Sequence, residues 1–329
     1  MKFAAFDLEG PLVVQDNAYE LMKLFPHGNR VFEVISRYDD LLTLDRREGY
    51  EPGDTLALIV PFLVFHNITE ADIGSLAERA ILTPGAADLL GKIRSSGWET
   101  FCITTSYSQY AQHIAGRLGQ DVRRVASTPF PLDSFRASLL AEDFSFIEQM
   151  EKKILEMAGA GNDSVLKEAL DKFYWEKLPL TNFGRVQRLV KPVGGIRKVQ
   201  ALEKFSAQDN VPFSQWVYTG DSITDSSVLE AVNRGGGLAV AFNANEYALP
   251  HATMGLASTN LLDLLPVMES WNHGGRDAVE KFIKGSGTGK KNENRENYHW
   301  LAGHTPPQEV LNIHKSIRRL VRQEAGGLG

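Results

Sequence analysis

The hydrophobic pattern of the chain alternates between short apolar runs and amphipathic helical stretches. Four runs are almost wholly apolar and end at polar residues: 2–7, 99–106, 215–221 and 238–243. Because these runs lack the alternation of a half-buried strand, they predict strands that are covered on both faces. Helical patterns at 108–119 and 223–235 follow the second and third runs, and another at 85–97 precedes the second. The pattern predicts an α/β fold with a doubly wound, Rossmann-like parallel sheet.

Two long helical stretches interrupt this rhythm. We expect residues 13–83 to form a helical cap inserted after the first strand, and residues 129–190 to form a further helical insertion. The remaining segments are assigned to a catalytic core and to a C-terminal part with a Gly-rich polar linker (284–297) and a closing helix. The core comprises 1–12, 84–128 and 191–270, and the C-terminal part comprises 271–329.

Length, charge and cysteine content narrow the classes of protein that fit. The 329 residues exceed one ordinary core, which agrees with a core that carries large insertions. A formal net charge of -6 argues against nucleic acid or an anionic membrane as a partner. No apolar run is long enough to span a bilayer, no signal peptide is visible, and Cys102 is the only cysteine. We therefore expect a cytoplasmic protein.

Polar residues that suit phosphoryl transfer stand at the strand ends and helix starts of the predicted sheet. Because the carboxyl ends of parallel strands meet at one edge, we expect these residues to converge: Asp7, Glu9, Thr104, Lys198, Asp221 and Asp225. An aspartate can attack phosphorus and carry the phosphoryl group. Mg²⁺ takes hard oxygen ligands such as carboxylates, and a hydroxyl and an ammonium can hold phosphate oxygens.

Charge at this edge also points to a metal ion. Asp7, Asp221 and a phosphate dianion would bring about four negative charges together, and each like-charged pair at ~4 Å costs about 4 kcal/mol at surface-like dielectric. One Mg²⁺ and one lysine would nearly neutralise this set. The residues therefore predict a Mg²⁺-dependent phosphohydrolase acting on a small phosphorylated metabolite.

Four segments resemble the motifs of the haloacid dehalogenase superfamily, in the family's order, and the last three look most like its phosphoserine phosphatase branch. They are "FAAFDLEGPL", "TFCITTSYSQYAQHIA", "GGIRKVQALEKF" and "VYTGDSITDSSVLEAV". Within the superfamily, "DLEGP", "RREGYEPG" and "AFNANEYAL" resemble an archaeal and bacterial group that includes proteins described as subunit R of an energy-converting hydrogenase. The resemblance covers about half of the chain, namely the core.

The resemblance implies a role for each motif residue. Asp7 would be the nucleophile, and the carbonyl of Glu9 and the carboxylate of Asp221 would bind Mg²⁺. Thr104 would contact the phosphate, with Lys198 between the phosphate and Asp7. Asp225 would be a further ligand or a hydrogen-bond partner of a water on the metal. Its position one helical turn after Asp221 directs both side chains the same way.

The first motif departs from the family pattern at Glu9 and Pro11, where the phosphatases usually carry aspartate and threonine. The side chain at position 9 should protonate the leaving oxygen and then activate water, which glutamate can also do. The departure, together with the helical insertions and the closing helix, supports an alternative function. In that alternative, the chain is a binding or assembly subunit with little or no turnover. Its helical insertions would contact a second copy of the chain in a homodimer, or a partner in a protein complex.

Several assignments stay open at the sequence level. Lys191 or Arg197 could replace Lys198, and Thr105 or Ser106 could replace Thr104 or bind phosphate through backbone N–H groups at the next helix start. Asp16 falls where the phosphoserine branch has an acidic residue that receives a substrate ammonium. Arg46 or Arg47 could close over an anionic substrate, or belong to a solvated helix face. His314 is expected to be structural.

Overall fold

The computed structural model describes residues 2–135, 139–159, 162–285 and 297–322. It contains one seven-stranded sheet with the strand order β3-β2-β1-β4-β5-β6-β7, in which only β7 is antiparallel to its neighbour. The strands are β1 (Lys2–Phe6), β2 (Trp98–Tyr107), β3 (Val125–Thr128), β4 (Trp216–Gly220), β5 (Leu238–Phe242), β6 (Met254–Leu256) and β7 (Tyr298–Trp300). The predicted doubly wound α/β fold is confirmed. The short strands β3, β6 and β7 were not predicted.

Helices cover both faces of the sheet, which explains the unbroken apolar runs. In β1, Phe3 and Ala5 face a core formed with α12 and α13, whereas Ala4 and Phe6 face a core formed with α6, α7 and α14. The helices that pack around the sheet are α6 (Ala86–Ser95), α7 (Ser108–Arg117), α12 (Ile196–Asp209), α13 (Ser226–Arg234), α14 (Leu265–Lys284) and α15 (Gln308–Arg322).

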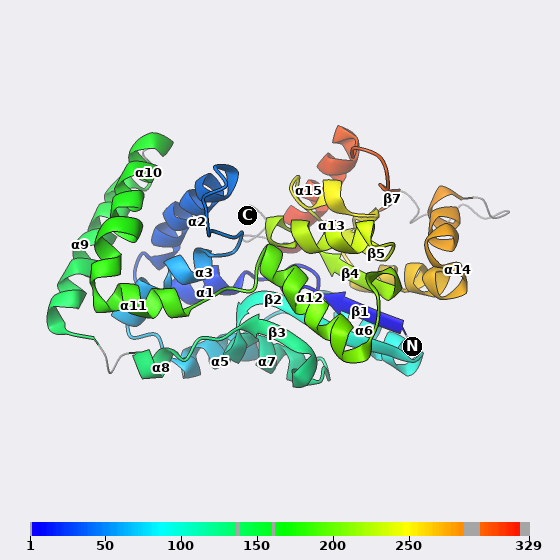
Figure 1. Ribbon diagram of the computed structural model, residues 1–329, viewed down its shortest axis with the longest axis horizontal. Helices are drawn as coiled ribbons and strands as arrows, with labels where there is room; N and C mark the ends of the chain where they lie inside the picture. Colours follow the sequence, from blue (N-terminus) through cyan, green and yellow to red (C-terminus); the bar gives the residue numbers. More distant parts are fainter. Residues whose placement is uncertain (1, 136–138, 160–161, 286–296, 323–329) are drawn as a thin grey trace.

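Helices from both predicted insertions pack together at one end of the molecule (Figure 1). We call this group the helical lobe: α2 (Gly28–Leu44), α3 (Thr55–Leu58), α4 (Val60–Phe65), α9 (Ala141–Met157), α10 (Asp163–Asp171) and α11 (Asn182–Leu189). Polar contacts join the two insertions. The Tyr38 hydroxyl donates to Asp171 at 2.5 Å, and the Tyr174 hydroxyl donates to the Leu58 carbonyl at 2.9 Å.

Three further helices lie between residues 17 and 135, apart from those already named. They are α1 (Asn17–Met22), α5 (Glu70–Arg79) and α8 (Leu132–Phe135). Helix α5 packs against α7, and the Arg117 guanidinium donates to the carbonyls of Ala77 and Ala80 at 2.7 and 2.8 Å. Short 3₁₀ helices lie at Val122–Arg124, Leu178–Leu180, Phe213–Gln215, Ile223–Asp225, Leu249–His251 and Leu261–Leu264, and a π-helix spans Lys172–Lys177.

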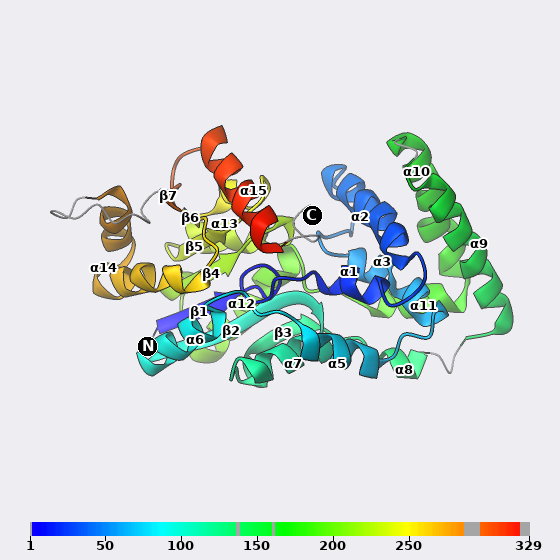
Figure 2. The same cartoon turned by 180° about the vertical axis from the view of Figure 1, so that it is seen from behind.

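The C-terminal part returns to the core. Strand β7 pairs with β6, and α15 then runs inward from beside β7 toward the middle of the molecule (Figure 2). Of the predicted linker, only residues 284–285 and 297 lie inside the described ranges. The predicted closing helix is present as α15.

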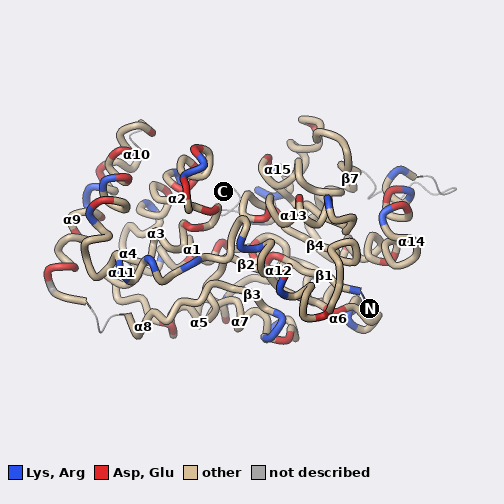
Figure 3. Tube along the Cα trace, viewed as in Figure 1, with Lys and Arg blue, Asp and Glu red and all other residues tan. Residues whose placement is uncertain are grey.

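Acidic and basic residues are interspersed along the chain trace (Figure 3). Among the described residues, no single helix has the length and apolar character needed to cross a membrane. Thr55–Phe65 and Glu70–Arg79 meet that criterion only as a pair, by length and composition, and are bent by 116° relative to each other.

Candidate active site

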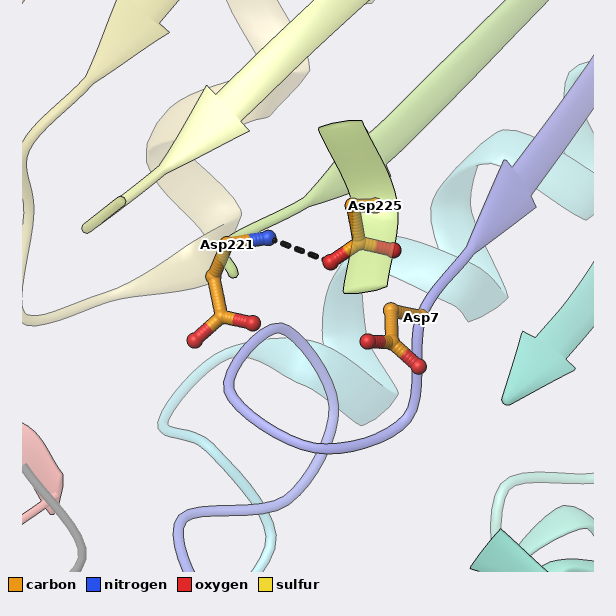
Figure 4. Close-up of side chains that lie close together, drawn as sticks. All are labelled: Asp7, Asp221 and Asp225. Carbon is orange, nitrogen blue, oxygen red and sulfur yellow. Dashed lines mark hydrogen bonds between the residues drawn. The ribbon is translucent and has the colours of Figure 1, made fainter. Parts of the chain in front are cut away.

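Three buried carboxylates meet at the carboxyl edge of the parallel strands (Figure 4). Asp7 follows β1, Asp221 follows β4, and Asp225 ends the turn after Asp221. One carboxylate oxygen of each lies within 4.8 Å of the others. The parallel pairing of β1 with β4 produces this meeting, because Phe6 pairs with Thr219 and the Asp7 N–H donates to the Thr219 carbonyl at 2.8 Å. The predicted convergence of the strand ends is therefore visible in the structure.

Lys198, near the start of α12, joins two of these carboxylates. Its Nζ lies 2.8 Å from Asp7 Oδ2 and 2.7 Å from Asp225 Oδ1, and its side chain is fully buried. Burial lowers the pKa of Lys198, but the two carboxylates outweigh burial and raise it above the usual value. Of the alternatives, Arg197 pairs instead with Asp54 in the segment before α3, and Lys191 is exposed.

Asp225 uses both oxygens within the protein. Oδ1 accepts from Lys198 and from the Tyr218 hydroxyl, each at 2.7 Å, and Oδ2 accepts from the N–H groups of Asp221 and Ser222 at 2.9 and 3.2 Å. Burial raises the pKa of Asp225, yet Lys198 and these donors bring it below the usual range. Asp225 therefore holds Lys198 and the loop of Asp221 in place, as a positioning group would.

The buried charge of Asp7 is less fully compensated by neighbouring groups than that of Asp225. Burial raises its pKa well above the usual value, Asp225 and Asp221 add to the rise, and Lys198 opposes it. Its Oδ1 accepts from the Leu8 N–H at 2.7 Å. A divalent cation beside this carboxylate would favour the ionised form.

Glu9 lies in the turn two residues after Asp7. Its carboxylate accepts from the Asn17 N–H at 2.7 Å and the Ser106 hydroxyl at 3.0 Å, with Thr105 Oγ1 at 3.5 Å. Burial raises its pKa to about 7, and the nearby Asp16 contributes, whereas the Asn17 hydrogen bond opposes the rise. A carboxyl that titrates near neutral pH can both donate and accept a proton there.

The end of β2 differs in detail from the prediction. The Thr104 side chain is buried, and its Oγ1 accepts from the Ser106 N–H at 3.1 Å. Thr105 instead lines a cavity that opens beside the carboxylates. The prediction that the N–H groups of Thr105 and Ser106 bind an anion at a helix start is wrong about the helix start. The strand continues to Tyr107 and α7 begins only at Ser108, so these groups are not at a helix start.

A small cavity of about 80 Å³ opens above the carboxylates and is lined from the core, α1, α2, the segment around α3 and α15. Asp16 is among its lining residues, and its carboxylate caps α1 by accepting from the Tyr19 N–H at 2.9 Å. Its role toward a substrate ammonium stays a prediction. Helix α2 contributes Phe32, Ser36 and Asp39, and α3 contributes Thr55.

The structure does not bring Arg46 or Arg47 to this cavity. Arg46 is exposed and has left-handed backbone geometry after the end of α2. The Arg47 guanidinium lies 4.2 Å from the centre of the Trp175 ring and 3.6 Å from Asp171 Oδ1. The prediction that one of them faces the substrate is not met, because cation–π and ionic contacts hold Arg47 against the second insertion.

Two arginines of α15 that were not among the predicted site residues enter the site. Arg318 and Arg322 both contact Asp221 Oδ2, Arg322 at 2.9 Å, and both are buried. Arg318 also donates to the Asp221 carbonyl at 3.3 Å. Their four-residue spacing, which continues back to buried His314, is the only sequence signal that placed them on one helix face.

The donor set suits a hard divalent cation. Mg²⁺ favours carboxylate oxygens, and Asp7, Asp221 and Asp225 each place one within 4.8 Å of the others. Because both oxygens of Asp225 accept hydrogen bonds within the protein, Asp7 and Asp221 are the carboxylates best suited to hold the ion. The glycine at position 10 also belongs to this arrangement. It has a φ of 95°, and a Cβ there would lie 2.4 Å from Asp221 Oδ2. Only glycine lets the turn after Asp7 pass so close to Asp221.

Comparison with known proteins identifies the fold. No protein-family model and no curated protein matches the chain. Gene product AF1437 from Archaeoglobus fulgidus is similar over 100% of this chain and 99% of its own, with 28% identity and a TM-score of 0.84. A phospho-aspartyl intermediate analogue of phosphoserine phosphatase and a substrate-bound phosphoserine phosphatase each superimpose with a TM-score of 0.50. They are 16% and 17% identical, and each match covers 80% of this chain and 97% of theirs. The chain thus has the fold of phosphoserine phosphatase.

Proposed function

We propose that the protein is a Mg²⁺-dependent phosphohydrolase that acts on a small phosphorylated metabolite through an aspartyl-phosphate on Asp7. The observation that carries this proposal is the position of Asp7. Its carboxylate lies 2.8 Å from Lys198, in one cluster with Asp221 and Asp225, at the carboxyl edge of the sheet and on the wall of a cavity. The cavity volume of about 80 Å³ supports a small substrate.

Each residue has a chemical task in the proposed reaction. A carboxylate oxygen of Asp7 attacks phosphorus, the bond from phosphorus to the ester oxygen breaks, and the leaving oxygen takes a proton from Glu9. Glu9 then accepts a proton from the water that attacks the aspartyl-phosphate, and the bond between phosphorus and Asp7 breaks to release phosphate. The pKa of about 7 for Glu9 supports both directions of proton transfer at neutral pH.

Other groups would hold the phosphate and the metal. Lys198 and a hydroxyl at the end of β2, from Thr104 or Thr105, would bind phosphate oxygens. Asp7, the carbonyl of Glu9 and Asp221 would hold Mg²⁺, with Asp225 beside them. When bound, Mg²⁺ would neutralise charge between the phosphate and the carboxylates.

The Asp7→Asn variant tests this proposal. Phosphate release from a panel of phosphorylated metabolites, measured with Mg²⁺, should disappear in this variant while its circular dichroism stays that of the wild type. Asp209→Asn, which changes an exposed aspartate of α12, is the matched control and should retain full turnover. Equal phosphate release by wild type and Asp7→Asn would refute the proposal.

A second candidate function rests on the two arginines at Asp221. In this candidate, the chain keeps the phosphatase fold as a binding or assembly subunit with little turnover, which agrees with its resemblance to proteins described as hydrogenase subunits. The ion pairs of Arg318 and Arg322 with Asp221 support it, because they engage a carboxylate that a phosphatase needs for its metal. Titration with beryllofluoride separates the two candidates. A competent phosphatase should bind it at Asp7 only when Mg²⁺ is present.

A further inference from the structure

Helix α15 reaches the candidate metal site from the far end of the sequence. Arg318 and Arg322 lie 97 and 101 residues after Asp221, and both guanidinium groups contact the same carboxylate oxygen, Oδ2. Their side chains are 3% and 5% exposed, so the ion pairs are shielded from solvent. Three cations, Lys198 and these two arginines, thus stand beside the three carboxylates of the cluster.

Polar groups hold α15 in this position. The buried residues of the helix are His314, Arg318 and Arg322, and its apolar side chains are only partly buried or exposed. His314 Nδ1 accepts from the Ala244 N–H at 3.1 Å, and Arg322 Nε donates to the Val14 carbonyl at 3.3 Å. Val310 and Leu311 pack only partly buried against the core. An element held by so few buried apolar groups belongs to the part of a fold that opens most readily.

The arginines and a divalent cation need the same carboxylate. A dication bound by Asp221 would stand next to two guanidinium groups that also contact this residue, and like charges repel strongly in a buried site. The close approach of Gly10 to Asp221 Oδ2 leaves little room for both around that oxygen. Seating of α15 and binding of the metal therefore oppose each other.

We propose that α15 is an autoinhibitory plug, in which Arg318 and Arg322 take the place of the divalent cation at Asp221 until the helix withdraws. This proposal rests on the proposed function, because it assumes that Asp221 binds a metal. Linkage requires reciprocity: the metal loosens α15, and any partner that draws α15 away tightens metal binding by the same factor.

Binding of Mn²⁺, followed by electron paramagnetic resonance of the free ion, tests the competition without relying on activity. The variant R318Q/R322Q should bind Mn²⁺ at least about tenfold more tightly than the wild type, as expected when the competent state is populated one-tenth of the time or less. Arg319→Gln is the matched control, because Arg319 is the exposed neighbour on the same helix, and it should leave the affinity unchanged. Equal or weaker Mn²⁺ binding by R318Q/R322Q would overturn the plug.

Hydrogen exchange on the wild-type protein gives a second readout that needs no variant to fold. Adding Mg²⁺ should reduce the protection of backbone amides in α15 several-fold, while those of α12 keep theirs. Unchanged or increased protection of α15 with Mg²⁺ bound would refute the inference and leave the proposed function standing. If neither the wild type nor R318Q/R322Q binds Mn²⁺, the metal site itself fails, and the proposed function fails with it.

Discussion

The sheet edge and helix α2 both line the cavity, and both bring buried carboxyl groups to it, but they treat the charge differently. At the sheet edge, Asp225 lies against Lys198, and its pKa falls below the usual range although burial opposes this. On α2, Asp39 is 8% exposed and accepts from the Tyr50 hydroxyl. Burial raises the pKa of Asp39 to about 7, and this hydrogen bond only partly opposes the rise.

This difference separates two uses of a buried carboxyl group. Asp225 stays ionised because Lys198 and the hydrogen-bond donors outweigh burial, although the lysine then becomes indispensable. At Asp7, burial still raises the pKa despite Lys198, so this carboxylate is the one that a bound cation would help to ionise. A carboxyl without a cation is held partly neutral by its surroundings and offers hydrogen bonds instead. The sheet edge is therefore suited to charge, and the lobe side of the cavity is suited to shape and hydrogen bonding.

The strongest test of this comparison removes the cation that two carboxylates share. Lys198→Met leaves Asp7 and Asp225 buried without a counter-charge, so the free energy of unfolding should fall by about 3–5 kcal/mol and turnover should be lost. Urea unfolding measures the first effect, and phosphate release measures the second. Lys204→Met, at an exposed position of the same helix, is the control and should stay within about 0.5 kcal/mol of the wild type. A loss below about 1 kcal/mol in Lys198→Met would show that the cluster does not depend on this cation.

A second test addresses proton transfer at Glu9. Glu9→Gln should still allow Asp7 to attack an activated ester, whose leaving group needs no proton, but hydrolysis of the aspartyl-phosphate should slow by about 10²–10⁴-fold. Rapid-quench kinetics should therefore show a burst of leaving group, followed by a slow steady state. Wild-type rates without a burst would mean that Glu9 serves only the turn, where it accepts from the Asn17 N–H.

The smallest expected effect concerns Asp39 on the lobe side. Its folded-state pKa of about 7 exceeds the usual 3.8, so the folded protein binds this proton more tightly than the unfolded chain does. The contribution of Asp39 to the free energy of unfolding is fully present below pH 3.8. It is lost as the pH rises through 7, and the loss is at most about 4 kcal/mol. Urea unfolding at pH 5 and pH 8 should show a smaller decline for Asp39→Asn than for the wild type. If the free energy of unfolding declines equally in the wild type and in Asp39→Asn, the ionised Asp39 lies in a more favourable environment than its burial indicates.

Much of the core could be predicted because its signals are local. The apolar runs that became β1, β2, β4 and β5 lack alternation, and the structure covers both faces of the sheet with helices. Asp7 and Asp221 directly follow two of these strands, so parallel pairing alone brings them together. Lys198 near the start of α12 completes the cluster in the position that the motif order indicated.

Other features escaped prediction because their causes are distant in sequence. Strands β3, β6 and β7 have three or four residues each, too few for a hydrophobic period to show. The sequence assigned Arg47 either to a solvated helix face or to an anionic substrate, and only the packing of the second insertion placed it against Trp175. Thr104 and Thr105 were both candidates at the end of β2, and only the tertiary structure shows that Thr105 lines the cavity and that the strand continues to Tyr107.

The sequence by itself determined the layered α/β core and the meeting of its strand-end carboxylates, because side-chain periodicity and strand direction are properties of short segments. Only the tertiary structure decided that the two insertions share one lobe and that α15 returns to Asp221 with two arginines. The physical reason is that the sequence around a charged side chain on an amphipathic helix does not indicate which residue this side chain will contact. Arg318 and exposed Arg319 are adjacent in sequence, and only the packing of α15 buries one of them against a carboxylate 97 residues away.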